Sequence, residues 1–334
     1  MKRRKSVLVT GGAGFIGSHV VDALINQGES VLVVDNLIGG HLKNLEQHKN
    51  QELLEFVDLD VVTLNPSNKL FKDVYKVFHL AGVGDIVPSI ANPIHYFKNN
   101  VMGTANILEA VRANSVESFV YAASSSCYGF AKTPTNELNE INPMYPYALT
   151  KYLGEQAVFH WSKVYGIRAN SICIFNAFGP RVRTSGAYGA VFGVFFKQKL
   201  AGEPLTIVGS GEQQRDFVFA SDVAEAFILA GRYKGSCQRF NIGSGNPKKI
   251  IELANLIGGK KVFIPSRPGE PEITHADITK ANKLLGWSPK ISFEQGVKDM
   301  LNSLESWSEA PLWTPESIAD ATKLWFKYLG TNET

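Results

Sequence analysis

Cysteine is scarce in this chain, and long apolar segments are missing. The 334 residues include three cysteines, at positions Cys127, Cys173 and Cys237. Their odd number and wide spacing fit neither a disulfide framework nor a set of metal ligands, so we expect reduced thiols, no metal and a cytoplasmic location. No apolar run approaches the roughly 18 residues that span a bilayer, so we expect no membrane partner.

An excess of charge of one sign is missing as well. The formal net charge is +3, which is too small and too dispersed to favour nucleic acid as a partner. The one basic run, KRRK at residues 2–5, precedes an apolar stretch that stops at Thr10, too short for the core of a signal peptide. A hydrophobic content of 44% with 19% charged residues is typical of a soluble globular protein, and the length allows one large domain or two ordinary ones.

A glycine-rich loop follows the first apolar run. Residues 6–10, SVLVT, read as a strand, residues 11–17, GGAGFIG, as the loop, and residues 18–27 as an amphipathic helix. Glycines at these positions let the backbone approach a pyrophosphate at the helix N-terminus. A second apolar strand ends in Asp35, about 18 residues beyond the last glycine, where an acid binds a ribose 2′-hydroxyl and repels a 2′-phosphate. This context predicts binding of NAD rather than NADP, and the alternative is an ordinary strand–helix–strand unit with a glycine turn.

The alternation of strands and helices continues along the chain. We expect strands over residues 74–80, 117–123 and 167–175 and helices over residues 103–114 and 147–165. Repeated units of this kind predict an α/β fold with a doubly wound parallel sheet. Ligands in such sheets bind beyond the carboxyl ends of the strands.

Three serines stand at one such strand end, in SSSCYG at residues 124–129. Serines there either satisfy backbone groups of a turn or belong to a reaction centre. Downstream, Tyr147 and Lys151 are four residues apart and share one helix face. A free phenol has a pKa of about 10, and a neighbouring ammonium would lower it. Such pairs are common on amphipathic helices, but together with the glycine loop and the serines they favour catalysis.

These residues resemble the extended short-chain dehydrogenases/reductases, and within them the NAD-dependent nucleotide-sugar epimerases and dehydratases. The resemblance runs from residue 6 to about residue 300. In the first half it rests on four segments: residues 10–17, the pair at 58–59, HLAG at 79–82 and NVMGT at 100–104.

The resemblance implies roles for individual residues. It makes Ser124, Tyr147 and Lys151 catalytic, with Ser125 and Ser126 on the substrate side. It implies that NAD is bound by Gly11, Gly14, Phe15, Ile16, Gly17, Asp35, Asn36, Asp58, Leu59, Leu80, Ala81, Gly82, Asn100, Tyr147 and Lys151.

The residues after the first serine discriminate among the reactions of this family. In its 4,6-dehydratases Asp and Glu follow the catalytic Thr, and its decarboxylases usually place Glu where Ser126 stands. Serine can do neither task, so the pattern resembles the 4-epimerases, most closely those of UDP-glucose and UDP-N-acetylglucosamine. These oxidise the sugar at C4, rotate the 4-keto sugar and return hydride to the opposite face. Dehydratase, decarboxylase, 4-ketoreductase and a non-catalytic NAD-sensing scaffold are the alternatives.

The second half resembles the substrate-binding part of the family, whose substrate is a nucleotide-diphosphate sugar. The implied substrate residues are Asn176, Arg215, Arg267, Glu270 and Thr274. The two arginines would bind the diphosphate, because a guanidinium donates two parallel hydrogen bonds. Thr274 falls on a size gate at which a tyrosine would exclude an N-acetyl group, so a small threonine implies UDP-GlcNAc and UDP-GalNAc, with UDP-glucose and UDP-galactose as further substrates.

The resemblance also implies the organisation of the chain. Residues 1–175 with about 215–244 would form the NAD-binding domain, and residues 176–214 with about 245–334 a smaller α/β substrate lobe. The family pairs as homodimers through two helices, here near 97–114 and 147–165. The apolar residues that could make this contact are Leu108, Val111, Leu153, Val158 and Trp161.

Two features depart from the family pattern. Asp85 is an unexpected acid in the loop that reaches the sugar, and it either contacts an unusual substrate or faces solvent. Beyond residue 305 the chain outruns the usual family end, with Thr314 predicted to cap an extra helix over residues 310–330. We expect this helix to pack on the substrate lobe or on a partner subunit.

Overall fold

A computed structural model describes residues 5–182 and 191–330. The basic residues 2–4, and residues 183–190 and 331–334 of the expected substrate lobe, lie outside the described residues.

The described residues form a central sheet of seven strands, all parallel, in the order β11-β6-β5-β4-β1-β2-β3. The strands are β1 (Ser6–Thr10), β2 (Val31–Asp35), β3 (Leu54–Asp58), β4 (Val74–His79), β5 (Ser118–Ser124), β6 (Ala169–Ile174) and β11 (Gln238–Ile242). The predicted doubly wound parallel sheet is therefore confirmed.

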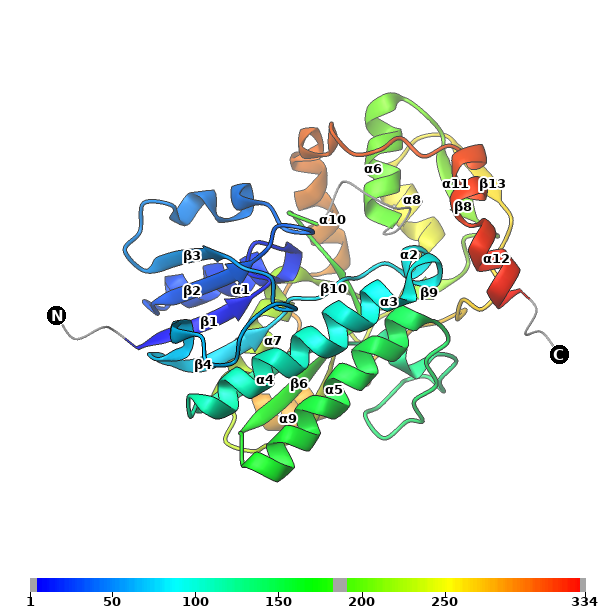
Figure 1. Ribbon diagram of the computed structural model, residues 1–334. Coiled ribbons are helices and arrows are strands. Elements are labelled where there is room, and N and C mark those ends of the chain that lie inside the picture. Colours follow the sequence, from blue (N-terminus) through cyan, green and yellow to red (C-terminus); the bar gives the residue numbers. More distant parts are fainter. Residues whose placement is uncertain (1–4, 183–190, 331–334) are drawn as a thin grey trace.

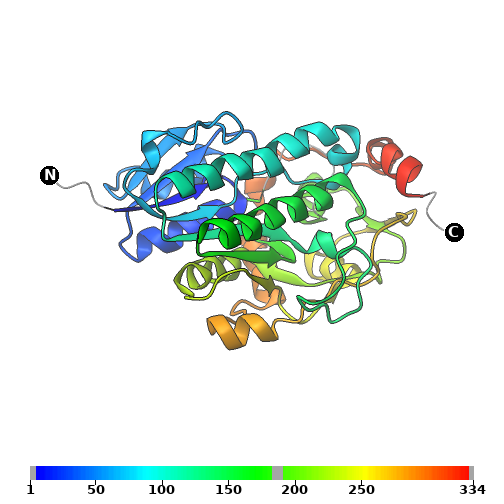
Figure 2. The ribbon, with the colours of Figure 1, turned by 60° about the horizontal axis from the view of Figure 1, so that its bottom comes forward.

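Helices cover both faces of this sheet, which explains why its central strands are mostly apolar and mostly buried. On one face α1 (Phe15–Asn26) and α7 (Ala220–Arg232) close a core with β1, β2 and β6. On the other, α4 (Gly103–Ala113) and α5 (Pro146–Tyr165) lie side by side over a second core (Figures 1 and 2). Because the strands are parallel, their carboxyl ends lie along one edge of the sheet, between these two helical layers.

A third core lies beyond that edge of the sheet. It gathers apolar side chains from α6 (Val191–Ala201), α8 (Ile250–Ile257) and α10 (Phe293–Asn302). Within it Phe217 stacks on Phe293, and Phe178 contacts both rings at steeper angles. Three strand pairs accompany it: β7 (Asn176–Phe178) with β10 (Phe217–Phe219), β8 (Leu205–Val208) with β13 (Lys261–Ile264), and β9 (Gln214–Arg215) with β12 (Lys248–Lys249).

The remaining elements are short connections. They are α2 (Ile86–Ala91), α3 (Pro93–Tyr96), α9 (Thr279–Leu285), the π-helical segment η3 (Phe97–Met102), and the 3-10 helices η1 (Leu42–His48), η2 (Lys69–Phe71), η4 (Ser125–Tyr128) and η5 (Leu304–Trp307).

Several predicted element bounds were wrong by a few residues. The first helix begins at Phe15 rather than Ser18, directly on the glycine loop, because Gly14 serves as its N-cap. The second strand includes Asp35, and the strand before the serines includes Ser124. Polar residues at the end of an apolar run still pair with the neighbouring strand, which the hydrophobic pattern does not reveal.

The C-terminal segment is not the single helix that we predicted. It forms α11 (Pro315–Ala321) and α12 (Lys323–Leu329), which Thr322 separates. The predicted cap is present: Thr314 and Ser317 form a reciprocal capping box at the start of α11. The helix α12 packs against α2, beside the third core (Figure 1).

The structure corrects the apolar contact that we predicted between subunits. Leu108, Val111 and Val158 are fully buried in the second core of the chain itself, so they cannot meet another copy. Leu153 and Trp161 remain partly exposed.

A search of the described residues finds no helix that has both the length and the apolar character to cross a membrane.

Candidate active site

The glycine loop has room for a ligand only because it lacks side chains. A Cβ on Gly17 would lie 2.0 Å from the carbonyl oxygen of Gly11. Gly11 has a φ of 69°, and a Cβ there would lie 2.6 Å from the backbone nitrogen of Ala81. Gly14, the N-cap of α1, provides no side-chain cap, so the first N–H groups of the helix face the loop. This arrangement suits an anionic group such as a pyrophosphate.

A cavity of about 370 Å³ begins at this loop and follows the carboxyl ends of the strands. Thirteen of the fifteen residues predicted to bind the cofactor line it; they are Gly11, Gly14, Phe15, Ile16, Gly17, Asp35, Asn36, Leu59, Leu80, Ala81, Gly82, Tyr147 and Lys151. The cavity thus joins the glycine loop to the Tyr147–Lys151 pair, as a dinucleotide with one end at the phosphates and the other at the reacting group requires.

Asp35 lines this cavity with a carboxylate that the backbone holds in place. Its carboxylate accepts hydrogen bonds from the backbone N–H of Ala13, at 3.0 Å, and of Leu37, at 2.8 Å. Burial raises the pKa of Asp35, while these two hydrogen bonds work against the rise. The fixed carboxylate can also accept the hydroxyls of a ribose, and it disfavours a phosphate.

Asp58 and Asn100 are not among the described residues that line the cavity. Asp58 is exposed and lies beside Asp35 in the sheet register. Asn100 is buried: its amide donates to Val83 and Thr150, each at 3.0 Å, and accepts from the Val83 N–H at 2.8 Å. It therefore holds the loop after β4, which lines the cavity at Val83, against α5.

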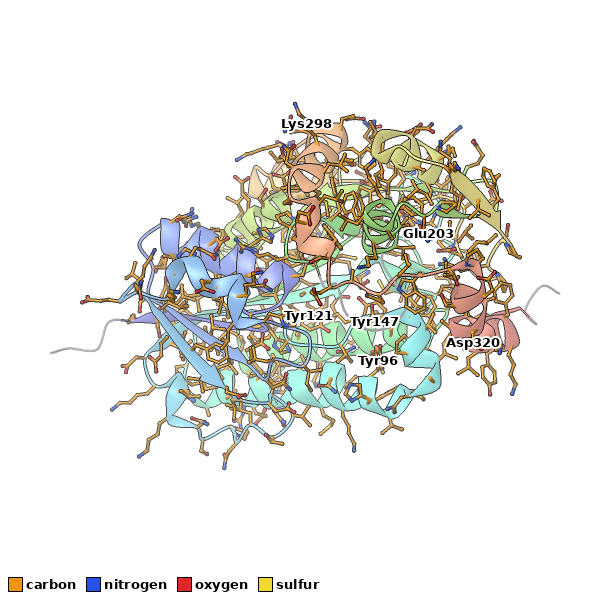
Figure 3. All side chains as sticks on the ribbon, turned by 90° about the horizontal axis from the view of Figure 1, so that it is seen from above. Tyr96, Tyr121, Tyr147, Glu203, Lys298 and Asp320 are labelled. Atoms are coloured by element: carbon orange, nitrogen blue, oxygen red, sulfur yellow. The ribbon has the colours of Figure 1, made fainter. Side chains whose placement is uncertain are left out.

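The serine and tyrosine predicted to share a substrate oxygen meet in the structure. Ser124 is the last residue of β5 and caps η4, and Tyr147 is the second residue of α5. The Ser124 hydroxyl lies close enough to the Tyr147 phenol to affect its pKa. Tyr147 lies in the interior between the helices, whereas Lys298 and Asp320 point outward (Figure 3).

The pKa of Tyr147 is raised from its ordinary value, whereas we expected the Lys151 ammonium to lower it. Burial is the largest cause of the rise. The nearby Ser124 hydroxyl works against it, and the Asp85 carboxylate adds to it. Lys151 is itself buried, with its ammonium 4.5 Å from the centre of the Tyr121 ring. Burial lowers the pKa of Lys151 to about 8, and the Glu155 carboxylate opposes this.

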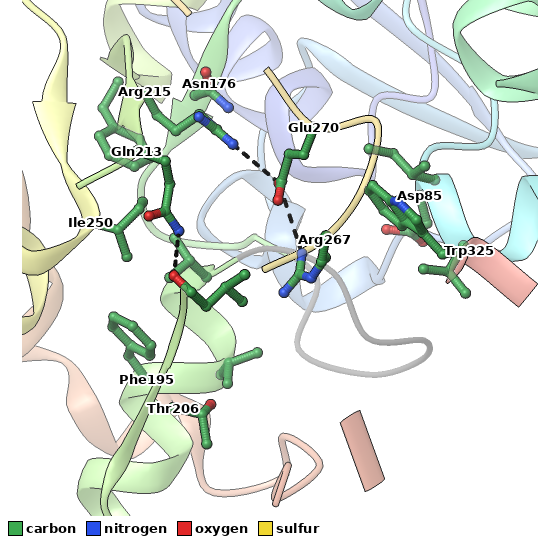
Figure 4. A pocket seen from close by; sticks show the side chains of 16 residues that line it. Asp85, Asn176, Phe195, Thr206, Gln213, Arg215, Ile250, Arg267, Glu270 and Trp325 are labelled. Carbon is green, nitrogen blue, oxygen red and sulfur yellow. Dashed lines mark hydrogen bonds and ion pairs between the residues drawn. The ribbon is translucent and has the colours of Figure 1, made fainter. Parts of the chain in front are cut away.

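A second cavity, of about 270 Å³, extends into the third core. Four of the predicted substrate residues line it: Asn176, Arg215, Arg267 and Glu270. The Glu270 carboxylate lies 3.2 Å from the Arg215 guanidinium and 3.8 Å from that of Arg267 (Figure 4). Two guanidiniums, of Arg215 and Arg267, and two carboxylates, of Glu270 and Asp85, therefore line this cavity. The guanidiniums are the groups that suit a diphosphate.

Asp85 lines both cavities, so they meet at this residue. It has a φ of 70° and stands at the start of α2. We left open whether Asp85 contacts the substrate or faces solvent, and the structure places it in the lining of both cavities. Its carboxylate is close enough to Tyr147 to raise the pKa of the phenol.

Ser125, Ser126 and Thr274 are not among the described residues that line either cavity. The Ser126 side chain lies near the Tyr145 phenol, where it works against the rise that burial causes in the pKa of that phenol. Thr274 lies behind Asn176: its hydroxyl donates to the Asn176 side-chain oxygen at 2.8 Å and accepts from the Asp216 N–H at 3.1 Å.

Sequence reasoning missed most of the apolar lining and one aromatic residue. Val191, Val194 and Phe195 of α6 form an apolar wall of the second cavity. Their spacing marks a buried helix face, but it does not tell a core from a cavity. Trp325 of α12 also lines the cavity, and no local motif pointed to it.

Comparisons with known proteins agree with this geometry. The model of the NAD dependent epimerase/dehydratase family matches residues 7–243. A putative UDP-glucose 4-epimerase of Methanocaldococcus jannaschii is 36% identical over 309 residues, covering 90% of this chain and 98% of its own.

Two solved structures are similar over nearly their whole length. The UDP-N-acetylglucosamine 4-epimerase from Methanobrevibacter ruminantium, in complex with UDP-N-acetylmuramic acid, has a TM-score of 0.83 at 31% identity. The UDP-glucuronic acid 4-epimerase from Bacillus cereus, in complex with UDP-glucuronic acid and NAD, has a TM-score of 0.84 at 31% identity. Each match covers 90% of this chain and 99% of the other.

Proposed function

The chain belongs to the NAD-dependent epimerase/dehydratase family, and from this premise we propose that it is an NAD-dependent UDP-sugar 4-epimerase. The observation that carries the proposal is the meeting of the two cavities at Asp85, with Tyr147 close by. A sugar that is anchored by its diphosphate in the second cavity would present C4 to Tyr147 at this point.

NAD suits the first cavity, because the glycine loop, the N-terminus of α1 and Asp35 fit its phosphates and ribose. When bound, it supplies the hydride acceptor for the oxidation at C4 and the hydride donor for the reduction that follows.

Tyr147 and Ser124 handle the proton in this proposal. The Tyr147 oxygen accepts the proton of the C4 hydroxyl as the carbonyl forms, and it gives the proton back when hydride returns to the opposite face. The Ser124 hydroxyl lies near the tyrosine and would hold the same substrate oxygen. Lys151, one helical turn away, is the cation that favours the phenolate, in opposition to the burial that disfavours it.

The residues beside the reaction centre support epimerisation over the alternatives. The dehydratases and decarboxylases of the family carry acids after the catalytic hydroxyl, whereas Ser125 and Ser126 stand there in this chain. Neither serine can protonate a departing hydroxyl at neutral pH.

In the second cavity, Arg215 and Arg267 would bind the diphosphate and Glu270 a ribose hydroxyl. Thr274 is small and hydrogen-bonds Asn176, which lines the second cavity. Because the resemblance implies that a small residue at this gate admits an N-acetyl group, we assign UDP-GlcNAc and UDP-GalNAc as the first substrates, followed by UDP-glucose and UDP-galactose. We also assign the chain to a homodimer in the cytoplasm. Residues 1–175 with about 215–244 would be its cofactor domain, and the remainder would be its substrate lobe.

The test is incubation of the purified protein with UDP-GlcNAc, UDP-glucose and UDP-glucuronic acid, followed by NMR of the products. We expect inversion at C4 with no change in mass, without added NAD, and release of NAD when the protein is denatured. Loss of water or of carbon dioxide in place of inversion would assign the chain to a dehydratase or a decarboxylase. The Tyr147→Phe variant serves as the inactive control.

A further inference from the structure

The C-terminal helix α12 brings an aromatic side chain into the second cavity. Trp325 is 2% exposed and lines the cavity together with Asp85, Ile86 and Val87 of the loop and helix α2 (Figure 4). We propose that Trp325 is a positioning residue for substrate, which fixes Arg267 and closes the end of the cavity that faces Tyr147. This inference rests on the proposed function, because it takes the second cavity as the site of the UDP-sugar.

Two contacts join Trp325 to the segment that carries Arg267. The indole N–H donates to the carbonyl oxygen of Pro268 at 2.6 Å. The indole ring faces the Arg267 guanidinium, with 5.7 Å between the guanidinium carbon and the ring centre. A cation at this distance is attracted by the ring, most strongly by a tryptophan that is out of water. The ring and the Glu270 carboxylate therefore both hold the guanidinium of Arg267.

Trp325 also contacts the side of the cavity where the reaction would occur. Its ring centre lies 6.4 Å from that of Tyr145, and the Tyr145 ring is stacked on Tyr147 at 6.5 Å with an angle of 8° between the planes. Aromatic pairs at these separations attract one another. A row of three rings thus runs from Trp325, which lines the second cavity, to the proposed catalytic tyrosine.

Three other large side chains of α12 face away from the cavity lining. Tyr328 is 52% exposed, and Leu324 and Phe326 are also exposed. A role confined to anchoring the end of the chain would make Trp325 a source of stability alone. A positioning role predicts in addition that substrate binding depends on the ring, and the two roles can be separated by experiment.

The experiment compares Trp325→Leu and Trp325→Phe with Tyr328→Ala, the matched control on the same helix. Leucine keeps apolar volume but has no ring, whereas phenylalanine keeps a ring and loses the N–H donor. For each variant we would measure KM and kcat with UDP-GlcNAc, the Kd of UDP-GlcNAc by calorimetry, the bound NAD and the melting temperature.

We expect Trp325→Leu to raise KM and Kd about tenfold, which corresponds to about 1.4 kcal/mol, with kcat within about threefold. Trp325→Phe should stay within about threefold of the wild type, Tyr328→Ala should match it, and all three should retain NAD. Equal KM in the leucine variant and the wild type, or an equal rise in Tyr328→Ala, would overturn the inference. A wild-type chain that binds neither UDP-GlcNAc nor UDP would overturn the proposed function as well, so the two failures are distinguishable.

Discussion

At the scale of single residues, Tyr147 stands where burial opposes the charge that catalysis needs. Burial raises the pKa of its phenol, and the nearby Asp85 carboxylate adds to the rise, while the Ser124 hydroxyl works against it. The spacing of Tyr147 and Lys151 in the sequence predicts their shared helix face, but it does not report how deeply both groups are buried. For that reason the sequence alone could not predict the direction in which the pKa of Tyr147 is shifted.

The first prediction concerns this phenol. Tyr147→Phe removes the group that exchanges a proton with the C4 hydroxyl and leaves the shape of the ring. Turnover should fall by roughly 10²–10⁴-fold, as is typical for the loss of a general acid–base group. The bound NAD, measured after denaturation, should equal that of the wild type. Near wild-type turnover would contradict the proposed mechanism.

The second prediction is the pH dependence that Lys151 imposes. Its pKa is about 8 in the folded chain, below the ordinary 10.5, because burial disfavours the ammonium. Activity that needs the ammonium, measured as kcat/KM, should therefore fall as the pH rises through about 8.

Stability should move in the opposite direction. Between pH 8 and 10.5 the unfolded chain binds more protons at this residue than the folded chain does, so the contribution of Lys151 to the free energy of unfolding rises with pH. Urea unfolding of wild type and Lys151→Met across this window checks the sign. A kcat/KM that stays flat to pH 9.5, or falls only as the chain unfolds, would contradict the prediction.

The third prediction concerns the size of residue 274. In Thr274→Tyr a bulky ring must fit behind Asn176, where the threonine hydroxyl now donates at 2.8 Å. Overfilling a packed site typically costs about 1–3 kcal/mol, so kcat/KM for UDP-GlcNAc should fall at least about tenfold relative to UDP-glucose. Thr274→Ser, which keeps the hydroxyl, is the control. An unchanged ratio of the two substrates would remove the main support for N-acetyl sugars.

At the scale of elements, the loop between β1 and α1 depends on glycine for its shape. The fourth prediction is that Gly17→Ala loses bound NAD, because its methyl group would lie 2.0 Å from the Gly11 carbonyl oxygen and the backbone must move. Gly28→Ala, just beyond the same helix, has open space but a φ of 78°. We expect it to lose about 1–2 kcal/mol of stability and to keep its NAD. Loss of NAD from both variants would point to general destabilisation instead.

Helices and strands with a clear apolar pattern in their own sequence could be predicted. The apolar run of β5 and the spacing in α1 are local signals, so the strand and the helix were found within a few residues. Apolar spacing marks a buried face without saying what covers it, which is why Leu108 was wrongly assigned to a subunit contact. Trp325 meets Pro268 across 57 residues of sequence, and no local pattern encodes such a contact.

At the scale of the whole molecule, the outer faces of α4 and α5 lie side by side (Figure 2). The fifth prediction is that two copies pair through this surface, where Val164 is 55% exposed. Light scattering at micromolar concentration should give the mass of two chains. Val164→Asp should shift the mass toward one chain, because a charge would enter an apolar contact. Leu138→Asp, at a side chain that is 95% exposed elsewhere, should leave the mass unchanged. A monomer mass for the wild type would refute the pairing.

The third core has a consequence for exchanging parts between relatives. It unites Phe178 and α6 with α8, α10 and Ile318. Between α6 and α8 in the sequence come α7, which packs on the sheet, and β11, which is one of its strands. A chimera with a single crossover would therefore combine two halves of this core that never evolved together, and the apolar faces of α6 and α8 would meet foreign partners. To transfer substrate specificity between relatives, a chimera should exchange the third-core segments on both sides of α7 together. It should also exchange the segment that carries Trp325.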